Sequence, residues 1–285
     1  MSKVAVITGA SSGFGLLTTI KLAEEGYDVL ATMRNLDKAK VFPSLVKDQN
    51  VLNRIEPFYV DVSDEESIQN LKVKLNAFPH VHLLVNNAGY ALGGFSEEIK
   101  LEDYRKQFDT NVFGAINVTQ AILPIMRRQQ FGTIINVSSI SGRVGFPGMS
   151  PYVSSKYALE GYSESLRLEV KLFGIQVALI EPGSYRTNIW SSSVEQSEAY
   201  MKEDSPYYEY TAALKSYINA NEEAHGNPME VAELISQIAA MKKIKKLRYP
   251  VGSGVKMTIL FKSLLPWALW EKVVVKHVLK GKRDV

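Results

Sequence analysis

The chain has 285 residues, of which 46% are hydrophobic and none is cysteine, so disulfides, thiolate metal sites and a cysteine nucleophile are excluded. Its net charge of +3 is unevenly spread: residues 242–285 carry a net +10, and the residues before them a net −7. No signal peptide and no apolar run long enough to span a bilayer is present, so we expect a soluble, cytoplasmic protein.

Short β-branched runs alternate with helical stretches along the chain. Strands are predicted at residues 4–8, 28–33, 55–60, 83–86, 133–138, 176–181 and 248–251. Helices are predicted at residues 14–25, after a capping-box sequence at 63–66, at 112–128 with a kink at Pro124, at 151–173 and at 229–241. This alternation predicts an α/β fold: a doubly wound (Rossmann-type), mainly parallel sheet with helices on both faces.

We interpret residues 1–285 as a single domain, because no repeat or low-complexity linker interrupts the series. Residues 184–227 break the rhythm after a predicted strand and are rich in Ser, Glu and Tyr. Because ligands of such folds bind beyond the carboxyl ends of the strands, this insertion is predicted to be a lid.

Glycines at positions 9, 13 and 15 follow the first predicted strand and open the first helix. They would let the backbone approach a pyrophosphate at the positive end of a helix. The spacing differs from the usual G-x-G-x-x-G, and a plain strand–helix turn is the alternative reading.

The second predicted strand ends without the acidic residue that binds the ribose 2′-hydroxyl of NAD. Arg34 stands there instead, and a guanidinium suits a 2′-phosphate. We therefore expect NADP(H), with NAD less favoured; an exposed loop arginine is the alternative.

Tyr152 and Lys156 are four residues apart on a predicted helix and so share a face. A nearby ammonium lowers the pKa of a tyrosine, which could then exchange a proton with an alcohol or a carbonyl during hydride transfer. Such a pair also arises by chance on exposed helices.

Polar side chains gather where other predicted strands end. Ser138 and Ser139 close the fifth strand, and one hydroxyl could hold a substrate oxygen, although the pattern does not choose between them. Asn86 and Asn87 close the fourth strand at the same edge. Asn111 begins a predicted helix, where capping is the simplest role.

Taken together, these residues resemble the classical short-chain dehydrogenase/reductase family, densely over residues 4–188. The matching motifs are Thr8 to Gly15, Asp61-Val62, Asn86 to Gly89, Asn111, Tyr152 with Lys156, Pro182-Gly183 and Thr187. The family's serine lies 13 residues before its tyrosine, which selects Ser139. Residues 31–34, 158–161 and 247–249 look like the 17β-hydroxysteroid and retinol dehydrogenase group, which implies a bulky apolar substrate.

The resemblance implies hydride transfer between NADP(H) and a secondary alcohol or carbonyl. It makes Tyr152 the general acid/base, Ser139 the residue that orients the carbonyl, Lys156 a ligand of the nicotinamide ribose that lowers the tyrosine pKa, and Asn111 part of a proton relay. The implied cofactor contacts are Gly9, Ser11, Ser12, Gly13, Phe14, Gly15, Arg34, Asp61, Val62, Asn87, Ala88, Gly89, Tyr152, Lys156, Pro182, Gly183 and Thr187.

Other readings compete with this one. A non-catalytic dinucleotide sensor would keep the glycines but would not need the Tyr, Lys and Ser set, and a peripheral membrane protein would act through its tail. No metal is expected, because His80, His82, His225 and His277 form no helical ligand pair. No nucleic-acid partner is expected either, whereas a homo-oligomer is.

Apolar side chains are predicted to surround the substrate, although several could merely pack the lid. They are Tyr90, Leu92, Val144, Phe146, Met149, Tyr185 and Trp190. The segment 253–285 is predicted to be amphipathic and helical. Its apolar side could close over the substrate, contact a second subunit or lie weakly on an anionic membrane; we rank the first two ahead of the third.

Overall fold

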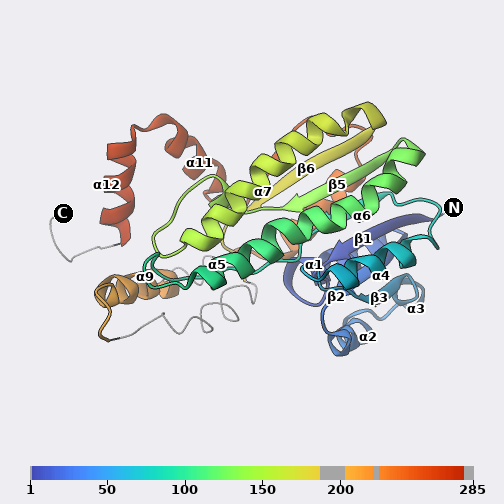
Figure 1. The fold of residues 1–285 in the computed structure, drawn as a ribbon, viewed down its shortest axis with the longest axis horizontal. Coiled ribbons are helices and arrows are strands. Elements are labelled where there is room, and N and C mark those ends of the chain that lie inside the picture. The colour runs from blue at the N-terminus through green and yellow to red at the C-terminus, as the bar shows by residue number, and fades with distance from the viewer. Residues whose placement is uncertain (1, 187–202, 221–224, 279–285) are drawn as a thin grey trace.

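The computed structural model describes residues 2–186, 203–220 and 225–278 (Figure 1). Seven parallel strands form one sheet in the order β3-β2-β1-β4-β5-β6-β7. Their bounds are β1 Lys3–Thr8, β2 Tyr27–Met33, β3 Ile55–Tyr59, β4 Leu83–Asn86, β5 Gly132–Val137, β6 Ile175–Pro182 and β7 Arg248–Val251. The predicted strands are confirmed, with ends that differ by at most one residue.

Helices cover both faces of the sheet (Figure 1). The helices are α1 Gly13–Glu24, α2 Val41–Leu45, α3 Gln49–Leu52, α4 Glu65–Leu75, α5 Leu101–Phe108, α6 Gly114–Gln129, α7 Ser150–Glu169, α9 Tyr208–Ala220, α10 Met229–Ala239, α11 Val255–Leu264 and α12 Trp267–Val278. Helices α1, α2 and α10 pack on one face, and α4, α6 and α7 on the other. The doubly wound fold class is therefore confirmed.

Successive strand residues point to opposite faces, which explains the apolar runs in the sequence. Ala5 and Ile7 pack against the α1 and α10 side, whereas Val6 between them packs against the α4 and α6 side. Both layers bury apolar surface, so the central strands are apolar throughout. All strands run in one direction, so their carboxyl ends meet at a single edge of the sheet. Strand order reverses between β1 and β4, where such folds bind ligands.

The prediction of one helix over residues 112–128 is wrong in its start. The structure has α5, then a π-helical turn at Asp109–Phe113, and then α6. The segment of α5 is short and charged, with Glu102 and Asp103 in its first turn and Arg105 and Lys106 in its last, so it has too few apolar residues to have been predicted from the sequence. Pro124 lies inside α6 as expected.

Two other helix ends also differ from the prediction. Asp64, and not Ser63, caps α4 by accepting from the backbone N–H of Ser67 at 3.0 Å, while the Ser63 hydroxyl donates to Asp61. Helix α7 ends at Glu169, and a 3₁₀ turn precedes Gly174 at φ +69°, a left-handed conformation that glycine adopts readily.

Two segments were predicted to be special. The part of residues 184–227 that the structure describes includes α9, while residues 187–202 and 221–224 lie outside the described residues, so the lid stays a prediction. The predicted helical segment 253–285 consists of α11 and α12 up to residue 278. No helix within the described ranges is both long and apolar enough to cross a membrane.

Candidate active site

The turn after β1 is built on glycines. Gly9 and Gly13 have φ of +66° and +54°, the left-handed region that glycine adopts without strain. A Cβ on Gly15 would stand 2.3 Å from the carbonyl oxygen of Gly9, so only glycine lets α1 pack this closely on the turn. The sequence alone left a plain strand–helix turn open as an alternative. The positive φ angles and the crowding of this turn show that it is specialised and tightly packed.

The N-terminus of α1 has free hydrogen-bonding capacity. Ser12 is its N-cap, but the Ser12 side chain makes no capping bond, and the first turn carries no acidic residue. The first backbone N–H groups of a helix are then available to an anion, which the helix dipole also attracts. Ser11 is half-buried, Ser12 exposed and Phe14 half-buried along the same turn.

Hydrogen bonds connect the segment after β4 to this turn. The backbone N–H groups of Asn87 and Ala88 donate to the hydroxyl of Thr8 at 3.0 and 2.9 Å. The side-chain amide of Asn87 donates to the carbonyl oxygens of Thr8 and Gly9 at 2.9 and 3.2 Å. Asn87 therefore holds the glycine turn in place, and its own amide group is already used by the protein.

Arg34 and Asp61 follow β2 and β3 at the same edge. Arg34 is exposed and has no ion-pair partner within the described ranges. The carboxylate of Asp61 accepts from the backbone N–H and hydroxyl of Ser63 at 3.0 and 2.7 Å. Val62 is buried against Gly114, where a Cβ would come within 2.4 Å of it. Their contact with a cofactor stays a prediction.

The structure brings the candidate catalytic residues together in the interior. Tyr152 and Lys156 lie on the buried side of α7, with the lysine Nζ 5.7 Å from the centre of the tyrosine ring. Lys156 donates from Nζ to the carbonyl oxygen of Val137, the last residue of β5, at 2.8 Å. Tyr152 is 4% exposed, Lys156 6% and Ser139 7%. A chance pair on an exposed helix face is excluded by this burial.

Burial decides how these groups hold their protons. It raises the pKa of Tyr152 to about 12, against the opposing influence of Ser139. It lowers the pKa of Lys156 to about 8, which the negative charge of Glu160 opposes. The group that lowers the tyrosine pKa here is the hydroxyl of Ser139, and the lowering by Lys156 stays a prediction. At neutral pH Tyr152 keeps its proton, and most of Lys156 is charged.

The two serines point in different directions. Ser139 faces Tyr152 and lowers its pKa, and its Oγ accepts from the backbone N–H of Ser141 at 3.1 Å. Ser138 points the other way, toward Glu160, whose pKa it lowers. A Cβ added to Gly142 would be 2.8 Å from both Ser138 Oγ and Glu160 Cγ.

Behind Lys156 lies an ionic cluster that the sequence analysis missed. Glu160 on α7 and Glu181 on β6 are both buried, and burial raises the pKa of each carboxyl group. Arg248 donates from Nε to Oε2 of Glu160 at 2.8 Å and lies 3.4 Å from Oε1 of Glu181. Arg143 pairs with the same Glu181 oxygen at 3.1 Å. The only signal in the sequence was that Glu160 and Glu181 are acidic residues in largely apolar segments. The arginines that pair with them are far away in the sequence.

Asn111 sits in the π-helical turn, 1% exposed, and does not cap a helix. Its side chain accepts from the backbone N–H of Tyr90 at 3.1 Å and donates to the carbonyl oxygen of Tyr90 at 2.9 Å. It also donates to Ser155 Oγ at 3.1 Å. A Cβ on Gly89 would be 3.0 Å from Asn111 Oδ1 and 3.9 Å from Lys156 Nζ. Asn111 thus ties the segment after β4 to α7, beside the lysine.

The segment after β6 packs against β7 and α11. The backbone N–H of Gly183 donates to the carbonyl oxygen of Val251 at 3.0 Å, and a Cβ there would come within 2.6 Å of Val255. Pro182 ends β6 directly before it. Thr187, like Trp190, lies outside the described residues.

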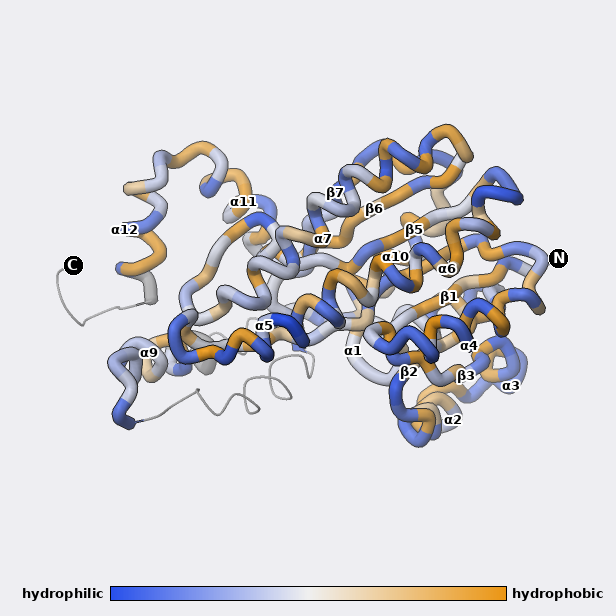
Figure 2. Tube along the Cα trace, in the orientation of Figure 1, coloured by the Kyte–Doolittle hydropathy of each residue, from blue (hydrophilic) through white to orange (hydrophobic). Residues whose placement is uncertain are grey.

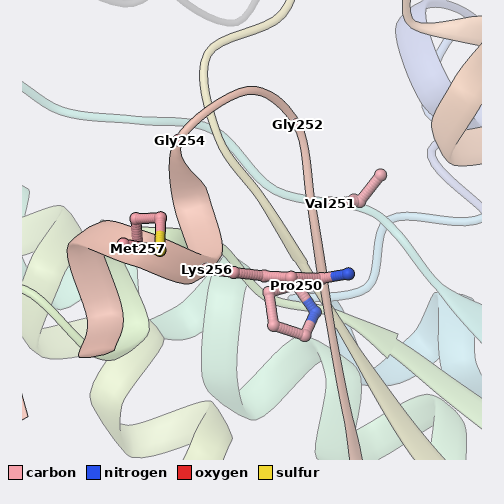
Figure 3. Close-up of a pocket in the computed structure, with 6 residues that line it drawn as sticks. All are labelled: Pro250, Val251, Gly252, Gly254, Lys256 and Met257. Carbon is pink, nitrogen blue, oxygen red and sulfur yellow. The ribbon is translucent and has the colours of Figure 1, made fainter.

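A surface pocket of about 280 Å³ opens where β7 leads into α11 (Figure 3). Its lining is Pro250, Val251, Gly252, Gly254, Lys256 and Met257. None of the candidate catalytic residues lines it, so we do not place the substrate there.

The residues predicted to surround a substrate divide into two groups. Leu92, Val144 and Tyr185 are buried, and the Tyr185 hydroxyl donates to Glu230 at 3.1 Å while its ring contacts Phe14 edge-on. These three pack in the interior of this structure, and their contact with a substrate stays a prediction. The partly or fully exposed ones are Tyr90, Phe146 and Met149. Among the described residues, no cluster of three His, Asp or Glu side chains could hold a metal ion.

Comparison with known proteins gives the same picture. The family model for short chain dehydrogenase matches residues 3–198. The chain is 51% identical to the uncharacterized oxidoreductase YusZ of Bacillus subtilis over 97% of this chain and 98% of the relative. It is 34% identical to a 3-ketodihydrosphingosine reductase of Bacteroides thetaiotaomicron, over 93% of each chain. An NADPH-dependent 3-dehydrocapnine reductase of Ornithobacterium rhinotracheale is 29% identical over 98% of each chain.

Solved structures share the fold over nearly the whole length. A short-chain dehydrogenase from Streptomyces avermitilis, 32% identical, superposes with a TM-score of 0.79 over 100% of this chain and 99% of its own. A short-chain dehydrogenase/reductase from Burkholderia phymatum in complex with NAD, 26% identical, gives 0.78 over 96% of this chain and 95% of its own. The chain is an oxidoreductase that belongs to the short-chain dehydrogenase family.

Proposed function

We propose that the protein is an NADPH-dependent reductase of ketones carried on extended apolar chains, with Tyr152 as the proton donor. The observation that carries the proposal is the state of Tyr152. It is buried, holds its proton at neutral pH because burial raises its pKa, and faces Ser139, just beyond the carboxyl end of β5. A group that holds its proton suits reduction, in which the carbonyl oxygen must receive one.

The residues at this edge fit a dinucleotide. The uncapped N-terminus of α1 and the glycine turn suit its pyrophosphate. Arg34 stands where an NAD site would carry an acid, and its guanidinium has no competing carboxylate within the described ranges. The family includes a structure in complex with NAD and a relative named for NADPH, so membership of the family does not determine the cofactor. The proposed preference for NADP therefore rests on Arg34.

The proposed chemistry divides between cofactor and chain. Bound NADPH would supply the hydride. Ser139 and Tyr152 hold the substrate carbonyl oxygen between their hydroxyls, and Tyr152 donates its proton to that oxygen as charge develops there. The charged Lys156, held by the carbonyl of Val137, stabilises the tyrosinate that results.

Asn111 has a positioning role in this scheme. Its amide is fully engaged by Tyr90 and Ser155, so it fixes the segment at Gly89 against α7 beside Lys156. A water relay from the lysine to solvent, as the family resemblance implies, would have to pass beside this amide.

The proposed substrate class rests on two features. Phe146 and Met149 lie in the loop between Ser139 and Tyr152 and expose apolar surface there. Two full-length relatives are named for the reduction of 3-ketodihydrosphingosine and 3-dehydrocapnine, the first of which is a ketone on a long aliphatic chain. A ketone of this class places its polar atom at Tyr152 and its apolar chain against the loop.

A homo-oligomer is also part of the proposal. Large apolar side chains are exposed on α5, the π turn and α7, three neighbouring elements. They are Leu101, Phe113, Tyr157 and Leu168. Sedimentation of the purified protein would test this, and a monomer at all concentrations would contradict it.

The function is tested with purified protein, NADPH and a panel of ketones, by following NADPH absorbance. We expect turnover with long-chain 3-keto compounds and little with acetone. Tight NADPH binding with no turnover on any carbonyl would favour the non-catalytic sensor instead.

A further inference from the structure

Helix α11 presents its apolar stripe to solvent. Met257, Leu260, Phe261 and Leu264 recur at the spacing of one helix face, and their exposed fractions run from 47% to 69%. The opposite face packs inward through Val255, which is 2% exposed. This is the inverse of an ordinary surface helix, whose apolar stripe faces the core and whose polar side faces water.

Helix α12 also exposes large apolar side chains. Trp267, Leu269 and Val273 are each more than half exposed, while Trp270 is buried and anchors the helix. We call Met257, Leu260, Phe261, Leu264, Trp267, Leu269 and Val273 the α11–α12 surface. Figure 2 shows hydrophobic residues recurring along both helices. An apolar surface of this extent on a folded protein marks a binding site.

The charges around this surface are mostly positive. Helices α11 and α12 carry Lys256, Lys262, Lys272 and Lys276, and their single acidic residue is Glu271. Lys262 lies with its Nζ 4.6 Å above the ring of Trp267, so a cation and an aromatic ring meet at the bend between the helices. A lysine can rest its aliphatic stem on apolar material and keep its ammonium at a polar boundary.

The surface lies at the active-site end of the molecule. Three residues separate the carboxyl end of β7 from the start of α11. The carboxyl ends of the strands form one edge of the sheet, and Tyr152 and Ser139 lie at that edge. In Figure 1 the two helices project from the body at that end, next to α9. Helices α11 and α12 carry a net +3, whereas residues 1–241 carry a net −7.

We propose that the α11–α12 surface docks on an anionic lipid bilayer. Its apolar side chains would enter the acyl boundary, and its lysines would meet the anionic headgroups. A twofold contact between two copies would bring the same lysine-rich surfaces together, which like charges disfavour. A lid would bury the stripe over the site, whereas here the stripe is exposed. Docking would bring the substrate edge to the phase that dissolves long-chain ketones.

The experiment is vesicle flotation of the full chain, without NADPH and without turnover. Vesicles of phosphatidylcholine alone are compared with vesicles that contain equal parts of phosphatidylglycerol. The test variant is the double substitution Phe261→Glu with Leu264→Glu. The control is Val73→Glu with Leu172→Glu, the same change of charge at side chains that are 70% and 88% exposed, on α4 and just after α7.

We expect the parent and the control to float with the anionic vesicles, more weakly as salt is added and much less with phosphatidylcholine alone. The test variant should lose about tenfold or more in vesicle partitioning with its fold intact by circular dichroism.

Three results would overturn the proposal. Equal binding by test and control variants would show that the surface is not the contact. A change in sedimentation mass of the test variant without vesicles would show that a second copy covers the surface, and a changed KM for a water-soluble carbonyl would show a lid. Because flotation needs no catalysis, a failure of the proposed ketone reduction leaves this result unaffected, and the reverse also holds.

Discussion

Arg248 donates from Nε to the Glu160 carboxylate at 2.8 Å, and this bond joins the last strand to the helix that carries Tyr152 and Lys156. Glu160 lies one helical turn beyond Lys156 and opposes the fall of the lysine pKa that burial causes. The groups that face Glu160 are Arg248 from β7, Arg143 from the turn after β5 and Ser138 from the end of β5, with Tyr157 on its own helix. The ionic cluster therefore bears on the charge of the catalytic lysine.

Glu160→Gln should move the alkaline limb of the kcat/KM profile to lower pH by about one unit. Loss of the negative charge lowers the Lys156 pKa further below about 8, so the ammonium that stabilises the tyrosinate is lost earlier as pH rises. The glutamine oxygen can still accept from Arg248. Glu164→Gln is the matched control, because the exposed Glu164 pairs with the same arginine at 2.7 Å. A limb that moves equally in both variants, or in neither, would contradict this account.

Tyr152→Phe keeps the ring packing and removes the proton donor. Turnover should fall by about 10²–10⁴-fold, the usual contribution of a general acid/base. NADPH affinity should change little, since the proposed phosphate contacts are at the end of α1. Stopped turnover with normal NADPH binding in a fluorescence titration supports the assignment, and turnover within twofold of the parent refutes it.

The sequence predicted the strands and the fold class because apolar runs and glycine turns are local signals. It missed α5, a short and highly charged helix, and it placed Asn111 at a helix start when the chain forms a π turn there. Spacing shows that a lysine is near Tyr152, but the rise of the tyrosine pKa comes from desolvation, which depends on everything packed around the hydroxyl.

The ionic cluster was beyond the reach of sequence patterns for a related reason. Glu160 and Arg248 are 88 residues apart, and only the pairing of β6 with β7 brings them together. Ser138 and Ser139 are indistinguishable as letters, but consecutive residues of an extended chain point to opposite sides. One serine therefore faces the tyrosine and the other the cluster.

Arg34→Asp should weaken NADPH binding by about tenfold or more and raise the relative use of NADH, because a 2′-phosphate would then face a carboxylate. Lys47→Asp is the control, since it makes the same change of charge at an exposed residue past α2. Cofactor titrations of both variants decide the matter. If NADPH affinity is the same in the two, Arg34 is a surface residue and the preference for NADP has another source.

Chain length provides the test of the apolar site. For a series of methyl ketones from acetone to 2-decanone, kcat/KM should rise with each added methylene until the site is filled, because each buried methylene favours binding by about 0.8 kcal/mol. Phe146→Ser should flatten that slope, since Phe146 lies in the loop between Ser139 and Tyr152 and exposes its ring. Phe131→Ser is the matched control: Phe131 is comparably exposed, at 38% against 36%, but precedes β5 at the opposite end of the sheet. If acetone is the best substrate of the parent, the apolar site is refuted; if both variants keep the parent's slope, Phe146 does not form it.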